Sequence, residues 1–222
     1  MHEAKERYPF PCLQQQGKTV ITAHSGCEGT PDNSREHILA AIASGAEMIE
    51  VDVRQTQDGL LYLSHDATED IGECPTLREL FELIEPEKNM AMNLDVKTDG
   101  LIEPAMALAS KFDLAGRIIF TGSCDNDRKL ANDLGADVWR GARTISEGIA
   151  TNRADGCPFL NVHFSHVTEE FEKELRSFGA SFSAWTVNDE DKIRQMLEMG
   201  IGNITTRNPV LALKLRKEIQ GI

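Results

Sequence analysis

Two carboxylates interrupt an apolar segment of the sequence. Glu50 and Asp52 alternate with aliphatic residues at positions 48–53, which read Met-Ile-Glu-Val-Asp-Val. Residues two apart in a β-strand project to the same face, and in a barrel strand the face opposite the aliphatic residues is the interior. Two ionised carboxylates crowded there repel each other unless a cation lies between them. The pattern therefore indicates a cation site, with neutralisation by a lysine as the alternative.

Asp95 and Lys97 repeat this arrangement in a later segment, Asn-Leu-Asp-Val-Lys at positions 93–97. One interpretation is that they pair with each other as ordinary charges at a strand end. In the other, Asp95 joins Glu50 and Asp52, and three carboxylates with positions left for water and phosphate are typical of a magnesium or calcium site. Zinc is disfavoured because no cysteine or cluster of histidines stands nearby in the sequence.

Two histidines stand at the ends of apolar runs on either side of the Glu50 segment. His24 ends the first run and His65 ends the third, and barrels carry their catalytic groups at this end of the strands. Histidine titrates near neutrality, so such a pair can accept one proton and donate another, each transfer contributing about 10²- to 10⁴-fold. A lone histidine at a strand end has a structural role as its alternative. His163 also follows an apolar run and could line the same end of the barrel.

Nine short apolar runs predict buried strands, and six amphipathic segments between them predict helices. The strand runs are Thr19–His24, Met48–Val53, Leu60–His65, Met90–Val96, Arg117–Phe120, Asp137–Trp139, Phe159–Val162, Phe182–Val187 and Asn203–Thr205. The helical segments are Ser34–Ser44, Thr76–Ile84, Ile102–Lys111, Asp125–Leu134, Thr168–Phe178 and Glu190–Met199.

Alternation of strands and helices predicts a parallel sheet. Several helical segments end at a glycine before the next strand, and no GxGxxG loop follows any strand, so a single (βα)8 TIM-type barrel is favoured over a doubly wound sheet. Because the barrel has eight strands, one of the nine predicted runs must lie outside it. Gln57-Asp58-Gly59 joins two runs without room for a helix and therefore predicts a hairpin outside the barrel.

Length and composition bound the domains and partners. The chain has 222 residues, 41% of them hydrophobic, which suits one domain, and the unpatterned residues 1–17 predict an arm before a barrel domain at 18–222. The formal net charge of -13 argues against nucleic acid or an anionic membrane surface as a partner. An anionic small-molecule substrate therefore needs a local cation.

Cysteine spacing and hydropathy bear on location. The five cysteines are widely spaced and show no CxxC pair, which disfavours a disulfide framework. No apolar run approaches the roughly 18 residues that span a bilayer, and the first residues lack the apolar region of a signal peptide. These features predict a cytoplasmic protein without stable membrane insertion. The composition permits a homodimer without requiring one.

The ordered motifs as a whole resemble the glycerophosphodiester phosphodiesterase family, from about Thr19 to Pro209. The motifs are His24-Ser25-Gly26, Pro31-Asp32-Asn33-Ser34, Glu50-Val51-Asp52, Asp58-Gly59, His65-Asp66, Asp95-Val96-Lys97 and Trp185-Thr186-Val187-Asn188. The resemblance implies a βα-barrel with the phosphodiesterase architecture of phospholipase C. It also implies hydrolysis of glycerophosphodiesters to glycerol 3-phosphate and an alcohol.

The resemblance also implies roles for individual residues. Glu50, Asp52 and Asp95 would hold a divalent cation, Mg²⁺ or Ca²⁺, while His24 and His65 would move protons. Substrate-binding positions would be Lys97 at the phosphate, Trp185 at the glycerol or head group, Ser25 and Asp32. The nucleophile is either water or the 2-hydroxyl of the substrate, which would give a cyclic phosphate first.

Three departures from the family pattern affect substrate binding. Ser25 stands where the family usually has an arginine, so one bidentate phosphate contact is missing. Asp32 replaces the glutamate of a Pro-Glu-Asn motif. Only about ten residues, Asp66–Pro75, join His65 to the next helix, where the family usually inserts a small subdomain.

The shorter connection predicts a more open site and a wider or different substrate range, including lysophospholipids as in the related sphingomyelinase D group. Two other functions stay open. One is an inactive barrel that binds a phosphorylated ligand, and the other is a lyase that stops at the cyclic phosphate.

Overall fold

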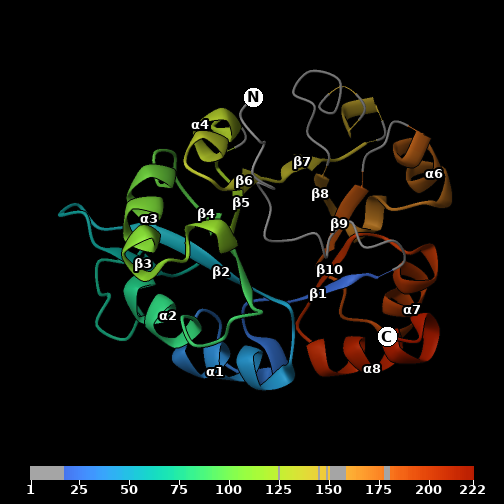
Figure 1. Ribbon diagram of the computed structural model, residues 1–222, viewed down its shortest axis with the longest axis horizontal. Helices are drawn as coiled ribbons and strands as arrows, with labels where there is room; N and C mark the ends of the chain where they lie inside the picture. Colours follow the sequence, from blue (N-terminus) through green and yellow to red (C-terminus); the bar gives the residue numbers. More distant parts are fainter. Residues whose placement is uncertain (1–17, 125, 145, 149, 151–158, 178–180) are drawn as a thin grey trace, which may run out of the picture.

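In the computed structural model, a ring of parallel strands is surrounded by helices (Figure 1). The structure describes residues 18–124, 126–144, 146–148, 150, 159–177 and 181–222. The predicted arm at 1–17 lies outside the described residues. The strands are β1 (Val20–Ala23), β2 (Met48–Gln55), β3 (Leu61–Leu63), β4 (Ala91–Val96), β5 (Ile118–Gly122), β6 (Asp137–Val138), β7 (Arg140–Ala142), β8 (Phe159–His163), β9 (Ser181–Trp185) and β10 (Asn203–Thr206). The α-helices are α1 (Arg35–Ser44), α2 (Leu77–Ile84), α3 (Ile102–Ala109), α4 (Arg128–Asp133), α6 (Glu169–Ser177), α7 (Glu190–Met199) and α8 (Pro209–Gln220).

The strands follow the order β6-β5-β4-β2-β1-β10-β9-β8-β7, and every neighbouring pair in this order is parallel. Only Trp139 separates β6 from β7, and its backbone N–H donates to the Phe120 carbonyl at 2.9 Å. Because β6 pairs with β5 and β7 pairs with β8, residues 137–142 act as one bent barrel strand. The predicted TIM-type barrel is confirmed.

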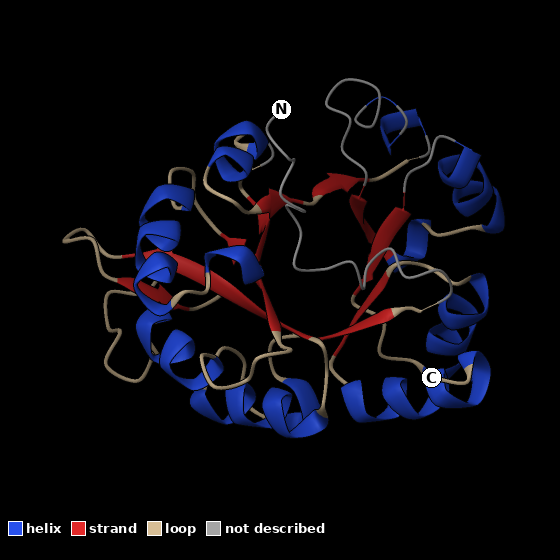
Figure 2. Ribbon diagram, in the orientation of Figure 1, coloured by secondary structure: helices blue, strands red, loops and turns tan. Residues whose placement is uncertain are grey.

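Strand β3 is the surplus run that the hairpin turn predicted. It pairs antiparallel with the end of β2 and has no other place in the strand order, and Gly59 in the turn has a φ of 92°. The left-handed φ explains why the turn contains glycine. The hairpin turn projects beyond the ring of strands and helices (Figure 2).

Helix boundaries follow their capping residues. The side chains of Ser34, Thr76 and Asp189 accept hydrogen bonds from backbone N–H groups in the first turns of α1, α2 and α7. Helix α8 was not predicted, because its proline and its many charged residues obscure the apolar spacing. Pro209 occupies the first turn, where a missing N–H costs nothing. None of the described helices is long and apolar enough to cross a bilayer.

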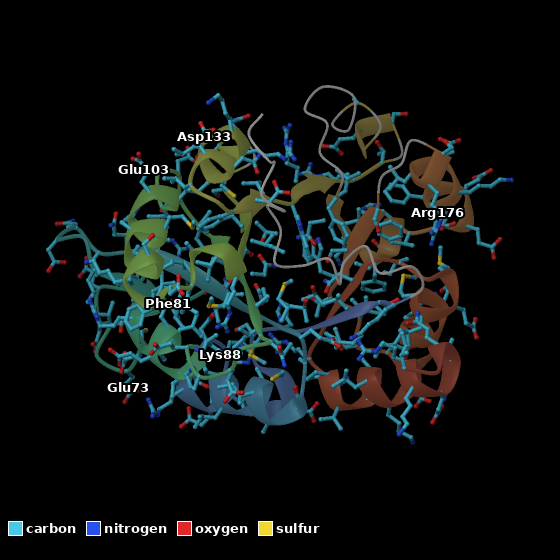
Figure 3. The ribbon with its side chains drawn as sticks, in the orientation of Figure 1. Glu73, Phe81, Lys88, Glu103, Asp133 and Arg176 are labelled. Carbon is cyan, nitrogen blue, oxygen red and sulfur yellow. The ribbon has the colours of Figure 1, made fainter. Side chains whose placement is uncertain are left out.

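Apolar side chains fill the space between the strands and the helices, where Phe81 of α2 is fully buried (Figure 3). Charged residues such as Glu103, Asp133 and Arg176 lie on the outer helices. A separate apolar cluster contains residues from β1, β2, β4, β5 and β8 together with Trp139: Val20, Met48, Ala91, Ile119, Trp139 and Phe159. Strand register places these residues on the inner face, below the polar residues at the carboxyl ends of the strands.

Candidate active site

Three carboxylates meet near the carboxyl ends of β2 and β4. Asp52 and Asp95 are direct neighbours in the strand register, and Glu50 lies two residues before Asp52 on the same inner face. One oxygen from each carboxylate lies within 4.8 Å of the other two. Glu50 and Asp52 are each only 5% exposed. The acidic cluster, defined as Glu50, Asp52 and Asp95, is therefore concentrated charge held away from solvent.

Lys97, which follows β4, contacts two members of the acidic cluster. Its Nζ lies 2.6 Å from Asp52 Oδ1 and 2.7 Å from Asp95 Oδ2. Burial alone would lower the pKa of the ammonium, but the charges of Asp95 and Asp52 outweigh it and raise the pKa. The two alternatives from the sequence, a neutralising lysine and an Asp95–Lys97 pair, are thus both present as contacts.

One lysine does not balance three carboxylates. Burial, with the nearby charges of Asp52 and Asp95, raises the pKa of Glu50 well above its ordinary value, and burial also raises that of Asp95. Asp95 Oδ1 is buried and accepts no hydrogen bond from any described residue. Unbalanced negative charge and an unpartnered carboxylate oxygen fit a bound cation, and an all-oxygen donor set suits Mg²⁺ or Ca²⁺.

A loop after β1 holds two of the carboxylates in place. The Ser25 N–H donates to Glu50 Oε2 at 3.0 Å. The Asn33 side chain makes two bonds to Asp52: Nδ2 donates to Oδ2 at 2.6 Å, and Oδ1 accepts from the backbone N–H at 2.9 Å. The Ser25 hydroxyl accepts a hydrogen bond from the Asn33 N–H at 2.8 Å and is buried. Asn33 stood in a motif but was not predicted as a site residue, because nothing in the sequence shows its double contact.

His24 faces the acidic cluster from the end of β1. Its Nδ1 lies 2.9 Å from the Ser25 carbonyl, and because a carbonyl only accepts, Nδ1 carries the proton. Its Nε2 lies 3.8 Å from Glu50 Oε2. Burial lowers the pKa of His24, and the positive charge of Arg207 adds to this effect. The neutral ring therefore presents an unprotonated Nε2 to the site.

His65 lies on the exposed loop after β3. Its Nδ1 is 2.9 Å from Asp66 Oδ1, and both side chains are largely exposed. The preceding N–H, of Ser64, donates to the Asp52 carbonyl at 3.1 Å, which fixes this loop at the end of β2. Within the described part of the chain, no hydrogen bond or ion pair joins the His65 ring to the acidic cluster.

The other predicted site residues lie on strand ends across the barrel or beside it. Trp185 ends β9, is 39% exposed, and is in register with His163 of β8, with ring centroids 5.2 Å apart. Asp32 lies beside β1 and pairs with Arg207 at 2.9 Å. His37, for which the sequence offered no context, is buried under Glu50, where its Nε2 donates to the Glu50 carbonyl at 3.1 Å. Burial lowers the pKa of His37 to about 4.

Comparison with known proteins points to one family. The profile of the glycerophosphoryl diester phosphodiesterase family matches residues 24–110, which contain His24, the acidic cluster and Lys97. Curated relatives that carry the glycerophosphodiester phosphodiesterase name are similar to the chain over most of its length, so the comparisons support this family. The part of the sequence beyond residue 110, which includes Trp185 and Arg207, lies outside the profile match.

Curated relatives align with nearly the whole chain. A glycerophosphodiester phosphodiesterase of Bacillus altitudinis is 25% identical over 245 residues, covering 91% of this chain and 100% of the relative. One from Caldanaerobacter subterraneus subsp. tengcongensis is 23% identical over 239 residues, covering 89% of this chain and 98% of the relative.

Solved structures share the fold. A glycerophosphoryl diester phosphodiesterase structure from Silicibacter pomeroyi has a TM-score of 0.79 at 16% identity, covering 92% of this chain and 95% of that chain. A phosphodiesterase from Oleispira antarctica, solved with the product sn-glycerol-3-phosphate, has a TM-score of 0.73 at 20% identity, covering 88% and 96%.

Gly122 lies against Asp95 and was not predicted as a site residue from the sequence. It ends β5 with a φ of 88°, and a Cβ built there would overlap Asp95 Oδ1 and the Val96 carbonyl. We expect Gly122→Ala to push Asp95 out of the acidic cluster and to weaken Mg²⁺ binding by about 10- to 100-fold. Titration calorimetry measures the affinity for Mg²⁺, and urea unfolding measures any change in stability.

Gly100→Ala is the matched control for Gly122→Ala. Gly100 has a φ of 80°, but a Cβ there meets nothing within 4 Å. It should therefore carry only the backbone cost of about 1–2 kcal/mol and leave Mg²⁺ binding unchanged. Equal effects of both alanines on Mg²⁺ binding would show that Gly122 does not position Asp95.

Proposed function

We propose that this chain is a divalent-cation-dependent phosphodiesterase that hydrolyses glycerophosphodiesters to glycerol 3-phosphate and an alcohol. The observation that carries the proposal is the buried acidic cluster, bridged by Lys97 and faced by His24, in a barrel of this family. The product complex of the Oleispira antarctica phosphodiesterase supports the assignment of glycerol 3-phosphate as the product.

Glu50, Asp52 and Asp95 would hold the cation, either Mg²⁺ or Ca²⁺. A bound cation of this kind would neutralise the charge that develops on the phosphoryl oxygens. The net negative charge left after Lys97 pairs with two carboxylates supports this assignment. The unpartnered Asp95 Oδ1 supplies a ligand atom without breaking a hydrogen bond of the described residues.

His24 and His65 would transfer the protons. The His24 Nδ1–H bond to the Ser25 carbonyl orients the ring, so Nε2 can take the proton from the attacking hydroxyl. His65, oriented by Asp66, would return a proton to the leaving alkoxide. The loop that carries His65 would have to bring the ring over the acidic cluster when substrate binds.

Lys97 and Trp185 would bind the substrate at opposite sides of the barrel. The ammonium of Lys97 would face the phosphoryl oxygens, and the exposed ring of Trp185 would cover the glycerol or the head group. The neighbouring His163 ring, nearly perpendicular to that of Trp185 at an interplanar angle of 87°, supports the indole from the next strand.

We also propose that the site accepts larger diesters, including lysophospholipids. The support is the short connection from His65 to the Thr76 cap of α2, which contains no described helix or strand and consists largely of exposed residues.

A cytoplasmic location and a homodimer remain predictions from the sequence.

The deciding experiment measures hydrolysis of glycerophosphocholine, bis(p-nitrophenyl) phosphate and lysophosphatidylcholine. We expect turnover that EDTA abolishes and Mg²⁺ or Ca²⁺ restores. Phosphorus NMR of the product separates a hydrolase from a lyase, because only a lyase accumulates the cyclic ester. A folded protein that binds the cation but turns over no diester would contradict the proposal, and strong preference for glycerophosphocholine would contradict the wider range.

A further inference from the structure

Arg207 brings a positive charge to the strand next to His24. Strands β1 and β10 pair in register from Val20 and Asn203 to Ala23 and Thr206, and the His24 N–H donates to the Thr206 carbonyl at 2.8 Å. One residue further, His24 and Arg207 are the next neighbours in this register. Residues in register on parallel strands share a face, so these two positions continue the inner face of β1 and β10 at their carboxyl ends.

Both the backbone and the side chain of Arg207 are held in place. Its N–H donates to Asn188 Oδ1 at 2.8 Å, and Asn188 is itself held through a bond from Asn208 Nδ2 to its carbonyl. Its guanidinium donates to Asp32 Oδ2 at 2.9 Å. Among the described residues, Asp32 alone accepts a hydrogen bond from this side chain, so most of its five N–H donors remain for a ligand.

The charges around the site favour a role for Arg207 in binding an anionic substrate. The acidic cluster, Asp32 and the net charge of -13 oppose the approach of a phosphodiester, and Lys97 is held between two carboxylates. Ser25, which follows His24, carries no charge and its side chain is bound by the Asn33 N–H. Arg207 follows β10, which borders β1 on the side opposite β2, the strand that carries Glu50.

We propose that Arg207 binds the phosphoryl oxygens of the substrate beside His24, with Asp32 as the carboxylate that holds the guanidinium ready. A guanidinium presents two parallel N–H donors that match two phosphoryl oxygens. The proposal rests on the proposed function for the identity of the phosphodiester. Arg207 should also bind inorganic phosphate and glycerol 3-phosphate, so the proposal can be tested by binding alone, without turnover.

The experiment compares Arg207→Met, Arg207→Lys, Asp32→Asn and Arg194→Met in the full chain at constant Mg²⁺. Arg194 is the matched control, because it is 38% exposed against 43% for Arg207 and also pairs with carboxylates, Glu190 and Glu218, but on the outer helices α7 and α8. Calorimetry measures binding of inorganic phosphate and glycerol 3-phosphate. Steady-state kinetics with glycerophosphocholine measures kcat and KM, and thermal melting shows that each variant is folded.

We expect Arg207→Met to weaken binding of both phosphate compounds, and to raise KM, by about 10- to 100-fold with a smaller change in kcat. Arg207→Lys should lie between it and wild type, since lysine keeps the charge but loses the two-donor geometry. Arg194→Met should bind as wild type does. Asp32→Asn should weaken phosphate binding less than Arg207→Met does, because the asparagine oxygen can still accept the hydrogen bond that holds the guanidinium.

A purely structural ion pair gives a different pattern. Arg207→Met and Asp32→Asn would then lower the melting temperature together while phosphate binding stayed unchanged in both, and that outcome overturns the proposal. Wild type that binds neither phosphate compound overturns it as well. Binding that depends on Arg207 without any turnover would support Arg207 while the proposed function fails. Turnover with an unchanged KM in Arg207→Met would support the proposed function and overturn the role of Arg207.

Discussion

Glu50→Gln is expected to lower kcat/KM for diester hydrolysis by about 10²- to 10³-fold, the loss typical when one group that stabilises transition-state charge is removed. The same change should stabilise the protein without a cation. Burial and the charges of Asp52 and Asp95 disfavour the ionised Glu50 carboxylate, whereas glutamine carries no charge and can still accept the Ser25 N–H bond. Kinetics at saturating Mg²⁺ and urea unfolding in EDTA measure the two effects.

The stability gain should depend on pH. A carboxyl whose folded-state pKa is raised binds its proton more tightly in the folded protein, so folding carries no penalty below the ordinary value of 4.5. The penalty grows as the pH rises from 4.5 through the raised pKa. The difference in unfolding free energy between Glu50→Gln and wild type in EDTA should therefore increase over this range and vanish at acid pH.

Glu47→Gln is the control at the opposite end of β2. Glu47 pairs with Arg216 at 2.8 Å and accepts a bond from the Ile21 N–H at 3.0 Å, on the side of the barrel away from the acidic cluster. Its replacement should cost roughly 1–3 kcal/mol of stability and leave kcat/KM intact. Retained activity in Glu50→Gln, or a loss of stability like that of Glu47→Gln, would contradict the assignment of Glu50 to the cation.

Much of the barrel could be predicted from its local pattern. A strand buried on both faces is a short apolar run, so all nine predicted runs contain strand, and the tight turn at Gly59 separated β3 from the barrel. Strand β7 escaped prediction because it reads Arg-Gly-Ala and is a strand only by pairing with β8. Helix α8 escaped because its stability comes from packing, with Ala212 and Leu215 buried, rather than from a clear apolar stripe.

The candidate site also contains residues that the sequence predicted and residues that it did not. Glu50, Asp52 and Asp95 could be found because a carboxylate inside an apolar strand needs a partner, and the three do lie together. Other residues of the site are distant in sequence from the groups that they affect. Gly122 limits the space for Asp95, and the charge of Arg207 acts on His24 only because the first and last strands pair. Such contacts follow from barrel closure, which no local pattern encodes.

His24→Asn is expected to lower kcat by about 10²- to 10⁴-fold, the usual contribution of a general base. Asparagine is the informative replacement because its amide can still donate to the Ser25 carbonyl, as Nδ1 does, while the basic Nε2 is lost. The exposed His166→Asn serves as the control and should remain active. Melting curves confirm that any loss in His24→Asn is a loss of chemistry rather than of folding.

The pH profile gives the prediction a second, independent measurement. A general base must be unprotonated, so activity falls as the pH drops through the pKa of His24, which burial and Arg207 hold below the ordinary value of 6.5. The acid limb of kcat/KM in wild type should therefore lie below pH 6.5, and the residual activity of His24→Asn should lack that limb. If the limb persisted in His24→Asn, another group would be the base, and the neutral Nε2 at 3.8 Å from Glu50 would serve only to complete the packing of the acidic cluster.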